Sequence, residues 1–333
     1  MKVFLTGGNG FIGSAVARHM VASGYDIVCL LRETSRLDRI AMLPFTRASG
    51  DVRDIASLRE AMSRCDCTVH LAAPGGWEQD EPSLLSQVLE DGARNVLEVA
   101  AKLRDHRVVV VSSTAAIAAS NQPIVFDERA AFSMPDMKLH YAFAKHRAEI
   151  IARQAYERGA PVIIVNPAEV YGPGDTALVT ARNLIDFATS APVLVCQGGT
   201  CVVHVDDVAA GIVAAVERGR PGERYILGGE NLTIRRLAEL VLELIGRRAL
   251  VVEIPNGLAR LATRLAVGLR LPLPYNPHVV PYATRYWFVD SAKAQRELGV
   301  AFRGARETIG ATLDWLEETM RLRSRQPQTR SHI

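Results

Sequence analysis

The sequence predicts an α/β fold in which helices cover both faces of a doubly wound parallel sheet. In the first half of the chain, short apolar runs typical of strands alternate with amphipathic stretches typical of helices. This alternation indicates consecutive βαβ units. A glycine-rich turn joins the first strand to the first helix. After residue 172 the elements become shorter, which predicts a smaller second lobe at the sheet edge where such folds bind ligands.

The elements can be placed in order along the chain. The strand-like runs before residue 170 are KVFLT, DIVCLL, a short run before GDVRD, CTVHLAA, RVVVVSS and PVIIVN. The helical stretches between them cover residues 11–23, 55–64, 88–103 and 141–158. Beyond residue 172 the pattern predicts a helix in HVDDVAAGIVAAVERG, a strand in RYILGG and a helix in IRRLAELVLELIG.

The composition favours a folded protein that handles small molecules. A chain of 333 residues with 48% hydrophobic content can bury a substantial core. The net charge of +3 is small and the basic residues are scattered, which argues against a nucleic-acid partner and a polybasic membrane patch. No apolar run is long enough for stable membrane insertion. The five cysteines lack zinc or redox spacing, so we expect no metal site, reduced thiols and a cytoplasmic location.

The segment TGGNGFIG, residues 6–13, follows the first strand directly and opens the first helix. Its first glycine allows a tight turn, the second lets backbone N–H groups approach a pyrophosphate, and the third brings helix close to strand. The helix N-terminus favours the phosphate charge. Glycines alone could form a structural turn, but the flanking strand and helix supply the context of a dinucleotide site. The predicted contacts are Gly7, Asn9, Gly10, Phe11, Ile12 and Gly13.

This site organises the rest of the chain. We predict a Rossmann-type NAD(P)-binding domain over residues 1–170, to which 203–228 return, a substrate-binding lobe over most of 171–320, and a flexible tail over 321–333. Asp51 and Val52 follow the third strand, a position from which the carboxylate could accept a hydrogen bond from an adenine amino group.

The residue after the second strand bears on the choice of cofactor. An NAD enzyme usually has an acid there, whereas this chain has Arg32, which can pair with a 2′-phosphate. Arg36 and Arg39 lie close enough to add to the site. The alternative is a solvated start of a basic helix, and Glu33 is an awkward neighbour for a phosphate. We therefore predict NADP in preference to NAD.

Tyr141 and Lys145 in YAFAK are four residues apart, which places both side chains on one helical face. A free phenol is a poor acid or base at neutral pH. An ammonium group one turn away, together with an oxidised nicotinamide, would favour the phenolate and lower the pKa of the tyrosine. Thr114 ends the strand VVVVSST, where its hydroxyl could donate to the substrate oxygen. Alone, such a pair could be a surface contact, but its position after a dinucleotide loop indicates catalysis.

These motifs resemble the extended short-chain dehydrogenase/reductase superfamily over nearly the whole chain. The glycine loop, the Thr114, Tyr141 and Lys145 set, and the segments HLAA, NPAEVYGPGD, VHVDDVAAG and GERYILGGENLT match its signatures, closest to the dihydroflavonol 4-reductase-like branch, which includes hopanoid-associated sugar epimerases. The resemblance implies a homodimer built by the helices at 83–103 and 141–158. It also implies cofactor contacts from Leu71, Ala72, Ala73, Lys145, Pro167 and Ala168.

The sequence favours reduction of a ketone or aldehyde by NADPH, with Tyr141 as proton donor. The alternative is a nucleotide-sugar epimerase or dehydratase that keeps NAD bound. Members that bind sugar nucleotides usually have an arginine where this chain has Thr200, and an asparagine where it has Leu89. Both changes favour a less polar substrate without a diphosphate. A third hypothesis is a regulator that binds the cofactor without turnover.

The substrate contacts are harder to predict. Trp77, in the loop after the fourth strand, could form a wall against an apolar or aromatic substrate, or could simply be anchored in the core or exposed. Glu169 is a second candidate. In the segment 256–274, apolar residues recur at amphipathic helical spacing, which favours a helix that covers the cleft over a helix that contacts a membrane surface. His70 and His204 lie in predicted strands and are expected to be structural.

Overall fold

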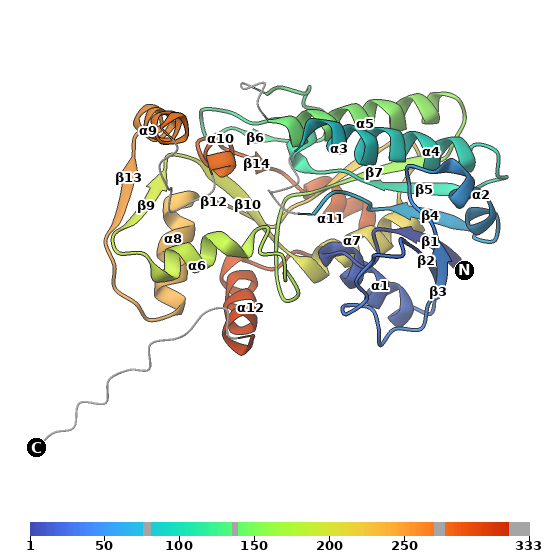
Figure 1. Ribbon diagram of the computed structural model, residues 1–333, viewed down its shortest axis with the longest axis horizontal. Coiled ribbons are helices and arrows are strands. Elements are labelled where there is room, and N and C mark those ends of the chain that lie inside the picture. The colour runs from blue at the N-terminus through green and yellow to red at the C-terminus, as the bar shows by residue number, and fades with distance from the viewer. Residues whose placement is uncertain (76–80, 135–138, 270–276, 320–333) are drawn as a thin grey trace, which may run out of the picture.

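The computed structural model describes residues 1–75, 81–134, 139–269 and 277–319. Its centre is a seven-stranded sheet in the order β11-β7-β5-β4-β1-β2-β3 (Figure 1). All neighbouring strands in it are parallel. The strands are β1 (Lys2–Thr6), β2 (Asp26–Leu31), β3 (Thr46–Ser49), β4 (Cys67–His70), β5 (Arg107–Val111), β7 (Val162–Pro167) and β11 (Arg224–Leu227). The strand order reverses between β1 and β4, which is where a doubly wound sheet binds its ligand.

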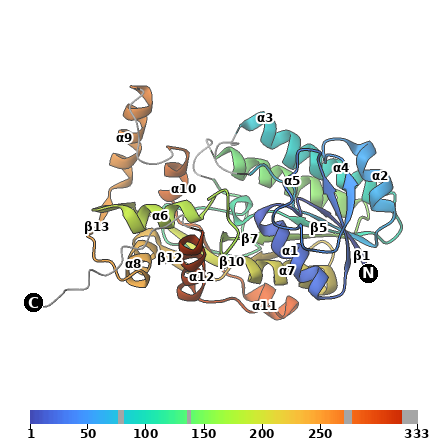
Figure 2. The same cartoon turned by 60° about the horizontal axis from the view of Figure 1, so that its bottom comes forward.

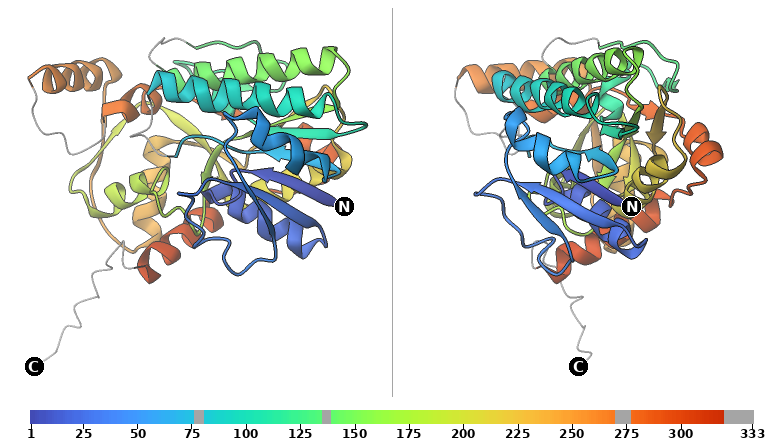
Figure 3. Two further views of the ribbon diagram at one scale, coloured as in Figure 1. Left: turned by 45° about the vertical axis from the view of Figure 1, so that its right-hand side comes forward. Right: turned by 90° about the vertical axis from the view of Figure 1, so that its right-hand side faces the viewer.

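Helices cover both faces of this sheet, as the sequence predicted (Figure 3). One layer contains α1 (Phe11–Ala22), α7 (Val205–Arg218) and α11 (Ala292–Leu298). The other contains α2 (Ile55–Ser63), α4 (Gly92–Ala100) and α5 (His140–Glu157). Because both faces are covered, the inner strands are buried throughout, which explains their continuous runs of valine and isoleucine.

The helix expected at 88–103 differs in its bounds. It begins earlier, as α3 (Pro82–Leu85), continues through the π-helical turn η2 (Ser86–Asp91), and ends with α4 at Ala100. The early start has a local cause, because the Glu81 carboxylate accepts hydrogen bonds from the N–H groups of Ser83 (3.1 Å) and Leu84 (2.9 Å). Proline at the first helical position also suits a helix start.

The remaining elements build a second lobe beside the carboxyl ends of the strands (Figures 1 and 2). Its sheets are β12-β10-β8, β13-β9 and β14-β6. The strands are β6 (Val125–Phe126), β8 (Glu169–Tyr171), β9 (Val193–Cys196), β10 (Gly199–His204), β12 (Glu230–Thr233), β13 (Val251–Ile254) and β14 (Phe288–Val289). The helices are α6 (Ala181–Thr189), α8 (Ile234–Leu244), α9 (Asn256–Gly268), η4 (Pro277–Val279), α10 (Val280–Ala283) and α12 (Ala305–Glu318). The short helix η3 (Thr114–Ala116) follows β5 and packs on α5 of the large sheet instead. A separate apolar core holds α6, α8 and α12 against β9 and β10.

The chain returns to the large sheet after β10. Helix α7 packs on α1, and β11 pairs with β7 at the sheet edge. Helix α7 and strand β11 therefore lie with the first part of the chain. None of the helices within the described ranges is long and apolar enough to cross a membrane.

Helix α9 (Asn256–Gly268) forms most of the segment 256–274, for which we expect a helix that covers the cleft. Its small residues Ala259 and Thr263 are buried against the lobe, whereas most of its leucines are exposed. The Arg260 guanidinium donates to Thr284 Oγ1 at 2.9 Å and fixes this orientation. Leu258, Ala259 and Ala262 line the cleft, so part of the helix covers it, whereas Leu261 and Leu265 face outward. Residues 270–276 lie outside the described part of the chain.

Candidate active site

The glycine loop between β1 and α1 forms a tight, glycine-dependent turn. Gly7 has φ of +69°, in the left-handed region, and its carbonyl accepts the Gly10 N–H at 3.0 Å. A Cβ atom on Gly13 would lie 2.1 Å from the Gly7 carbonyl oxygen. The loop therefore leaves no room for a side chain at the third glycine, and the α1 N-terminus stays open toward the cleft.

The ends of β1 and β4 are joined by hydrogen bonds. Thr6 Oγ1 lies 2.8 Å from His70 Nδ1 and accepts the Ala72 N–H at 3.2 Å. Burial, and next the charge of Lys145, lower the pKa of His70 to about 3. His70 is thus a neutral structural residue, which confirms its expected role. It holds the segment after β4 beside the glycine loop.

The arginines after β2 have different environments. Arg32 is exposed and lines the cleft. The exposed Arg36 pairs with Asp38 at 2.8 Å. Arg39 donates to the carbonyl oxygens of Gly174 (3.0 Å) and Asn9 (3.3 Å), so it links the glycine loop to the second lobe. Of the three, Arg32 therefore has the position best suited to a phosphate.

Asp51 lies at the same end of the cleft as Arg32. A two-pronged bond from Arg53, at 3.0 and 2.8 Å, lowers the pKa of the Asp51 carboxyl and keeps it ionised. An ionised carboxylate is a hydrogen-bond acceptor only, as the predicted contact with an amino group requires.

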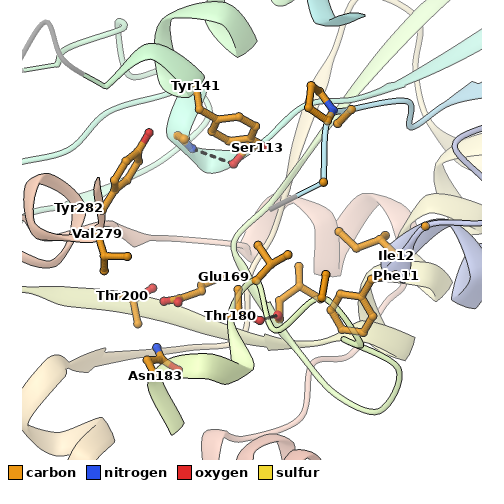
Figure 4. Close-up of a pocket in the computed structure, with 18 of the residues that line it drawn as sticks. Phe11, Ile12, Ser113, Tyr141, Glu169, Thr180, Asn183, Thr200, Val279 and Tyr282 are labelled. Atoms are coloured by element: carbon orange, nitrogen blue, oxygen red, sulfur yellow. Dashed lines mark hydrogen bonds between the residues drawn. The ribbon is translucent and has the colours of Figure 1, made fainter. Parts of the chain in front are cut away.

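Tyr141 and Lys145 come together from the first turns of α5, beside the end of β5. Lys145 Nζ donates to the Val111 carbonyl at 2.9 Å and lies 5.8 Å from the centre of the Tyr141 ring. The Tyr141 hydroxyl makes a hydrogen bond with Ser113, which lies beside it in Figure 4. Thr114 is buried and also lines the cavity. The structure therefore adds Ser113, a hydroxyl that the sequence did not single out.

The groups that shift the Tyr141 pKa in this arrangement do not include Lys145, and the lowering expected from Lys145 together with an oxidised nicotinamide stays a prediction. Burial raises the pKa of Tyr141 to about 12, and only the Ser113 hydrogen bond opposes it. Burial also lowers the pKa of Lys145 to about 8, against the opposing charge of Glu149. The physical reason is that the free energy lost when a phenolate is removed from water exceeds the free energy gained from its hydrogen bond with Ser113. The phenol is consequently protonated throughout the neutral range.

A buried polar network around Glu149 lies next to Lys145, on the side away from Tyr141 along α5. Glu149, one turn further along α5, is fully buried and accepts from Asn166 Nδ2 at 2.5 Å. Asn166 Nδ2 also donates to the Ser113 carbonyl at 2.9 Å, and Arg224 lies 3.4 Å from the Glu149 carboxylate. This network ties the lysine helix to the Ser113 backbone. The i, i+4 spacing of Lys145 and Glu149 was its only trace in the sequence.

A continuous cavity of about 2060 Å³ runs from the glycine loop past Tyr141 into the second lobe. The predicted site residues that line it are Gly7, Asn9, Gly10, Phe11, Ile12, Gly13, Arg32, Arg36, Asp51, Val52, Leu71, Ala72, Ala73, Thr114, Tyr141, Lys145, Ala168 and Glu169. Pro167 is the exception, because it is buried in β7 opposite Leu227 and does not line this cavity. Trp77 lies outside the described residues.

The far wall of the cavity carries a small polar cluster from β8, β10 and α6, across from Tyr141 (Figure 4). The Tyr171 hydroxyl donates to Glu169 Oε1 at 2.8 Å and accepts from Asn183 Nδ2 at 2.7 Å. Thr200 also bonds Glu169, and burial raises the pKa of this carboxyl. The Asn183 Oδ1 atom is buried and has no hydrogen-bond partner in the structure. The cluster can therefore both donate to and accept from a ligand.

The chain with this glycine loop and Tyr/Lys pair is similar to known proteins. The model of the NAD dependent epimerase/dehydratase family matches residues 3–228. The chain belongs to this family. It is an NAD(P)-dependent oxidoreductase of the short-chain dehydrogenase/reductase type, and the resemblance stated from its motifs is confirmed.

Three proteins that are similar to this chain have names that describe different activities. A 4-hydroxy-2-methyl-3-oxo-4-farnesyl-3,4-dihydroquinoline-1-oxide ketoreductase of Stigmatella aurantiaca is 31% identical over 315 residues, covering 91% of this chain and 92% of the relative. Sterol demethylase protein B of Methylococcus capsulatus is 28% identical, with 96% and 99% covered. A crystal structure of a nucleoside-diphosphate-sugar epimerase from Pseudomonas aeruginosa is 26% identical, with 97% and 99% covered and a TM-score of 0.78.

Proposed function

We propose that this enzyme uses NADPH to reduce a ketone or aldehyde of a small, largely apolar or aromatic metabolite, in a reversible reaction. The observation that carries the proposal is the partly buried phenol of Tyr141 at the wall of the cavity, whose raised pKa keeps it protonated. Reduction of a carbonyl requires an acid that holds its proton at neutral pH until the oxygen becomes basic. The ketoreductase of Stigmatella aurantiaca, similar over most of its length, supports the same type of reaction.

The residues present fit a dinucleotide. The loop of Gly7, Gly10 and Gly13 would hold the pyrophosphate, Asp51 the adenine and Lys145 the ribose next to the nicotinamide. A reduced nicotinamide supplies the hydride. The chain's own part is to fix the carbonyl group beside the phenol. Tyr141 then gives its proton to the substrate oxygen, while Thr114 and Ser113 orient that oxygen by hydrogen bonds.

The far wall supports a substrate without a diphosphate. Around the Glu169 cluster the cavity is lined by apolar side chains, among them Val195, Ile254 and Val279. A diphosphate carries two negative charges and would need cationic side chains around it. The side chains that bond Glu169 are instead the neutral hydroxyls of Thr200 and Tyr171. The nucleoside-diphosphate-sugar epimerase of Pseudomonas aeruginosa keeps a sugar-nucleotide reaction as the second candidate, through its similar fold.

The test of the function is a panel of ketones and aldehydes with either NADPH or NADH. We expect cofactor oxidation with apolar or aromatic carbonyl compounds and none with sugar nucleotides. Protection against thermal unfolding by each cofactor measures binding separately from turnover. Turnover of a sugar nucleotide without net cofactor consumption would favour the epimerase, and cofactor binding without any turnover would favour the regulator.

Arg32 is proposed to select NADPH through its 2′-phosphate. We expect Arg32→Ala to raise the KM for NADPH by roughly 10- to 100-fold, since hydrogen bonds between charged groups contribute about 1.5–3 kcal/mol. The KM for NADH should change little. Arg36→Ala is the matched control, because Arg36 is already paired with Asp38 and should contribute less. Equal effects of Arg32→Ala on both cofactors would contradict the assignment.

Glu169 is proposed to bind a polar group of the substrate through its carboxyl group, whose pKa burial raises. We expect Glu169→Leu to lower kcat/KM about 10- to 100-fold, because it removes a hydrogen bond and leaves Tyr171 without its acceptor. Glu169→Gln keeps the shape and a donor, so it should retain most activity. NADPH affinity should be the same in both variants. Full activity of the leucine variant would remove Glu169 from the substrate site.

We also propose a cytoplasmic homodimer. The cysteines at 29, 65, 67, 196 and 201 are all free thiols, which supports a reducing compartment. Helices α4 and α5 lie side by side on the outside of the sheet (Figures 1 and 3). On α5, the side chain of Ile150 is exposed, which supports these helices as the dimer surface. Sedimentation velocity measures the oligomeric state directly.

A further inference from the structure

Helix α9 exposes a continuous stripe of leucines to solvent. The exposed fractions are 57% for Leu258, 54% for Leu261, 56% for Leu265 and 69% for Leu269. Spacings of three and four residues place these four side chains on one side of the helix. Single exposed leucines need no explanation, but an ordered apolar patch marks an interaction surface.

The body of the protein fixes the direction in which the leucine stripe points. Ala259 and Thr263 are buried on the opposite side, and Thr263 Oγ1 donates to the Ala259 carbonyl at 2.8 Å. Arg260 is held by Thr284. Turning the stripe inward would break this bond and expose the packed small residues. Figure 2 shows α9 projecting from the second lobe.

The charge on α9 indicates the chemistry of the partner. The sequence NGLARLATRLAVG contains two arginines and no acidic residue. Arg264 is exposed and lies three residues after Leu261, so it borders the leucine stripe. A short helix with leucines on one side and arginine at the border suits an anionic lipid surface, where apolar side chains enter the headgroup region and cations bind phosphates.

The leucine stripe is also continuous with the cavity. Leu258, Ala259 and Ala262 of α9 line its rim, and Val280 of the neighbouring α10 lines the wall behind them. The apolar surface of the helix therefore leads directly into the chamber that ends at Tyr141. A soluble partner, including a second copy, bound to this stripe would obstruct the rim.

We propose that α9 docks the enzyme on an anionic lipid surface and holds the cavity rim at the membrane interface. An apolar substrate dissolved in the bilayer can then enter the chamber without crossing water. The docking rests on α9 alone, whereas the entry of substrate rests on the proposed function. The two parts can therefore fail separately.

The experiment is co-sedimentation of the full chain with vesicles of phosphatidylcholine and phosphatidylglycerol, and with vesicles of phosphatidylcholine alone. We expect binding to the mixed vesicles. Leu261→Gln combined with Leu265→Gln should weaken it about 100-fold, at roughly tenfold for each leucine. Arg264→Glu should weaken binding to the mixed vesicles about tenfold. Met42→Gln changes an exposed apolar residue outside α9 and should not change vesicle binding.

The controls keep the outcome clear. Glutamine preserves helix propensity, and the substituted leucines do not line the cavity, so thermal stability and NADPH binding should be unchanged. Absence of vesicle binding, or binding that the double variant retains, would overturn the docking. A dimer that the double variant dissociates would also overturn it, because a second copy would then cover the stripe. Vesicle binding by a protein that reduces no carbonyl would leave the docking intact and refute the proposed function.

Discussion

Tyr141→Phe should abolish reduction while leaving cofactor binding intact. The substitution removes only the phenol oxygen, and the ring keeps its packing against Leu85, Leu89 and Ala144. Without the proton that burial holds on this group, the rate should fall by roughly 100- to 10,000-fold, as is typical when a general acid is lost. Single-turnover oxidation of bound NADPH, with a carbonyl compound that the native protein reduces, measures the effect at the chemical step.

The controls for Tyr141→Phe remove other hydroxyl groups, either outside the cavity or next to the phenol. Tyr286→Phe removes a phenol oxygen outside the cavity and should change nothing. Ser113→Ala and Thr114→Val should each slow the reaction by less than Tyr141→Phe does. Their order of effect tells which hydroxyl orients the substrate oxygen. A Tyr141→Phe enzyme with substantial activity would refute the proton transfer proposed for this site.

The sequence could predict those parts of the site that depend on short spacings. The glycine loop lies within eight residues, 6–13, and the Tyr141/Lys145 pair within one helical turn, so local geometry alone brings these groups together. The strands of the large sheet were readable for a similar reason, since burial on both faces produces continuous apolar runs.

Other parts depend on how separate elements meet. Chain direction changes after β5, where η3 (Thr114–Ala116) begins, and this turn brings Ser113 to the phenol. Sequence spacing cannot decide which of two adjacent hydroxyls does so. The cluster of Glu169, Asn183 and Thr200 joins three elements of the second lobe. Its members are far apart in the chain and show no common pattern.

Periodicity and charge alone do not define the environment of a residue. The spacing of leucines in α9 correctly indicated an amphipathic helix, but an apolar stripe can face a core, a cleft or a partner. The structure shows that the small residues face the lobe. For Tyr141, the motif predicts that a lysine and an oxidised nicotinamide together lower the pKa, but it does not show that burial raises the pKa or that the lysine donates to the Val111 carbonyl. Desolvation depends on the whole fold, which the YAFAK motif does not contain.

Gly13→Ala should eliminate NADPH binding and destabilise the fold. A Cβ atom at this position would lie 2.1 Å from the Gly7 carbonyl oxygen and 2.9 Å from the Gly8 Cα atom. Both are backbone atoms, so no change of rotamer can relieve the clash. The loop must separate from α1, and the N–H groups that approach the pyrophosphate separate with it. We expect no detectable NADPH binding by fluorescence and a loss of about 1–3 kcal/mol in the free energy of unfolding.

Gly310→Ala is the matched control, because nothing lies within 4 Å of a Cβ atom at that position in α12. It should leave NADPH binding unchanged and raise stability by up to about 1 kcal/mol through higher helix propensity. Measuring binding well below the melting temperature of each variant separates a lost site from an unfolded chain. A Gly13→Ala protein that binds NADPH with native affinity would mean that the dinucleotide does not lie on this loop. The added methyl group displaces the same backbone atoms that would contact the pyrophosphate.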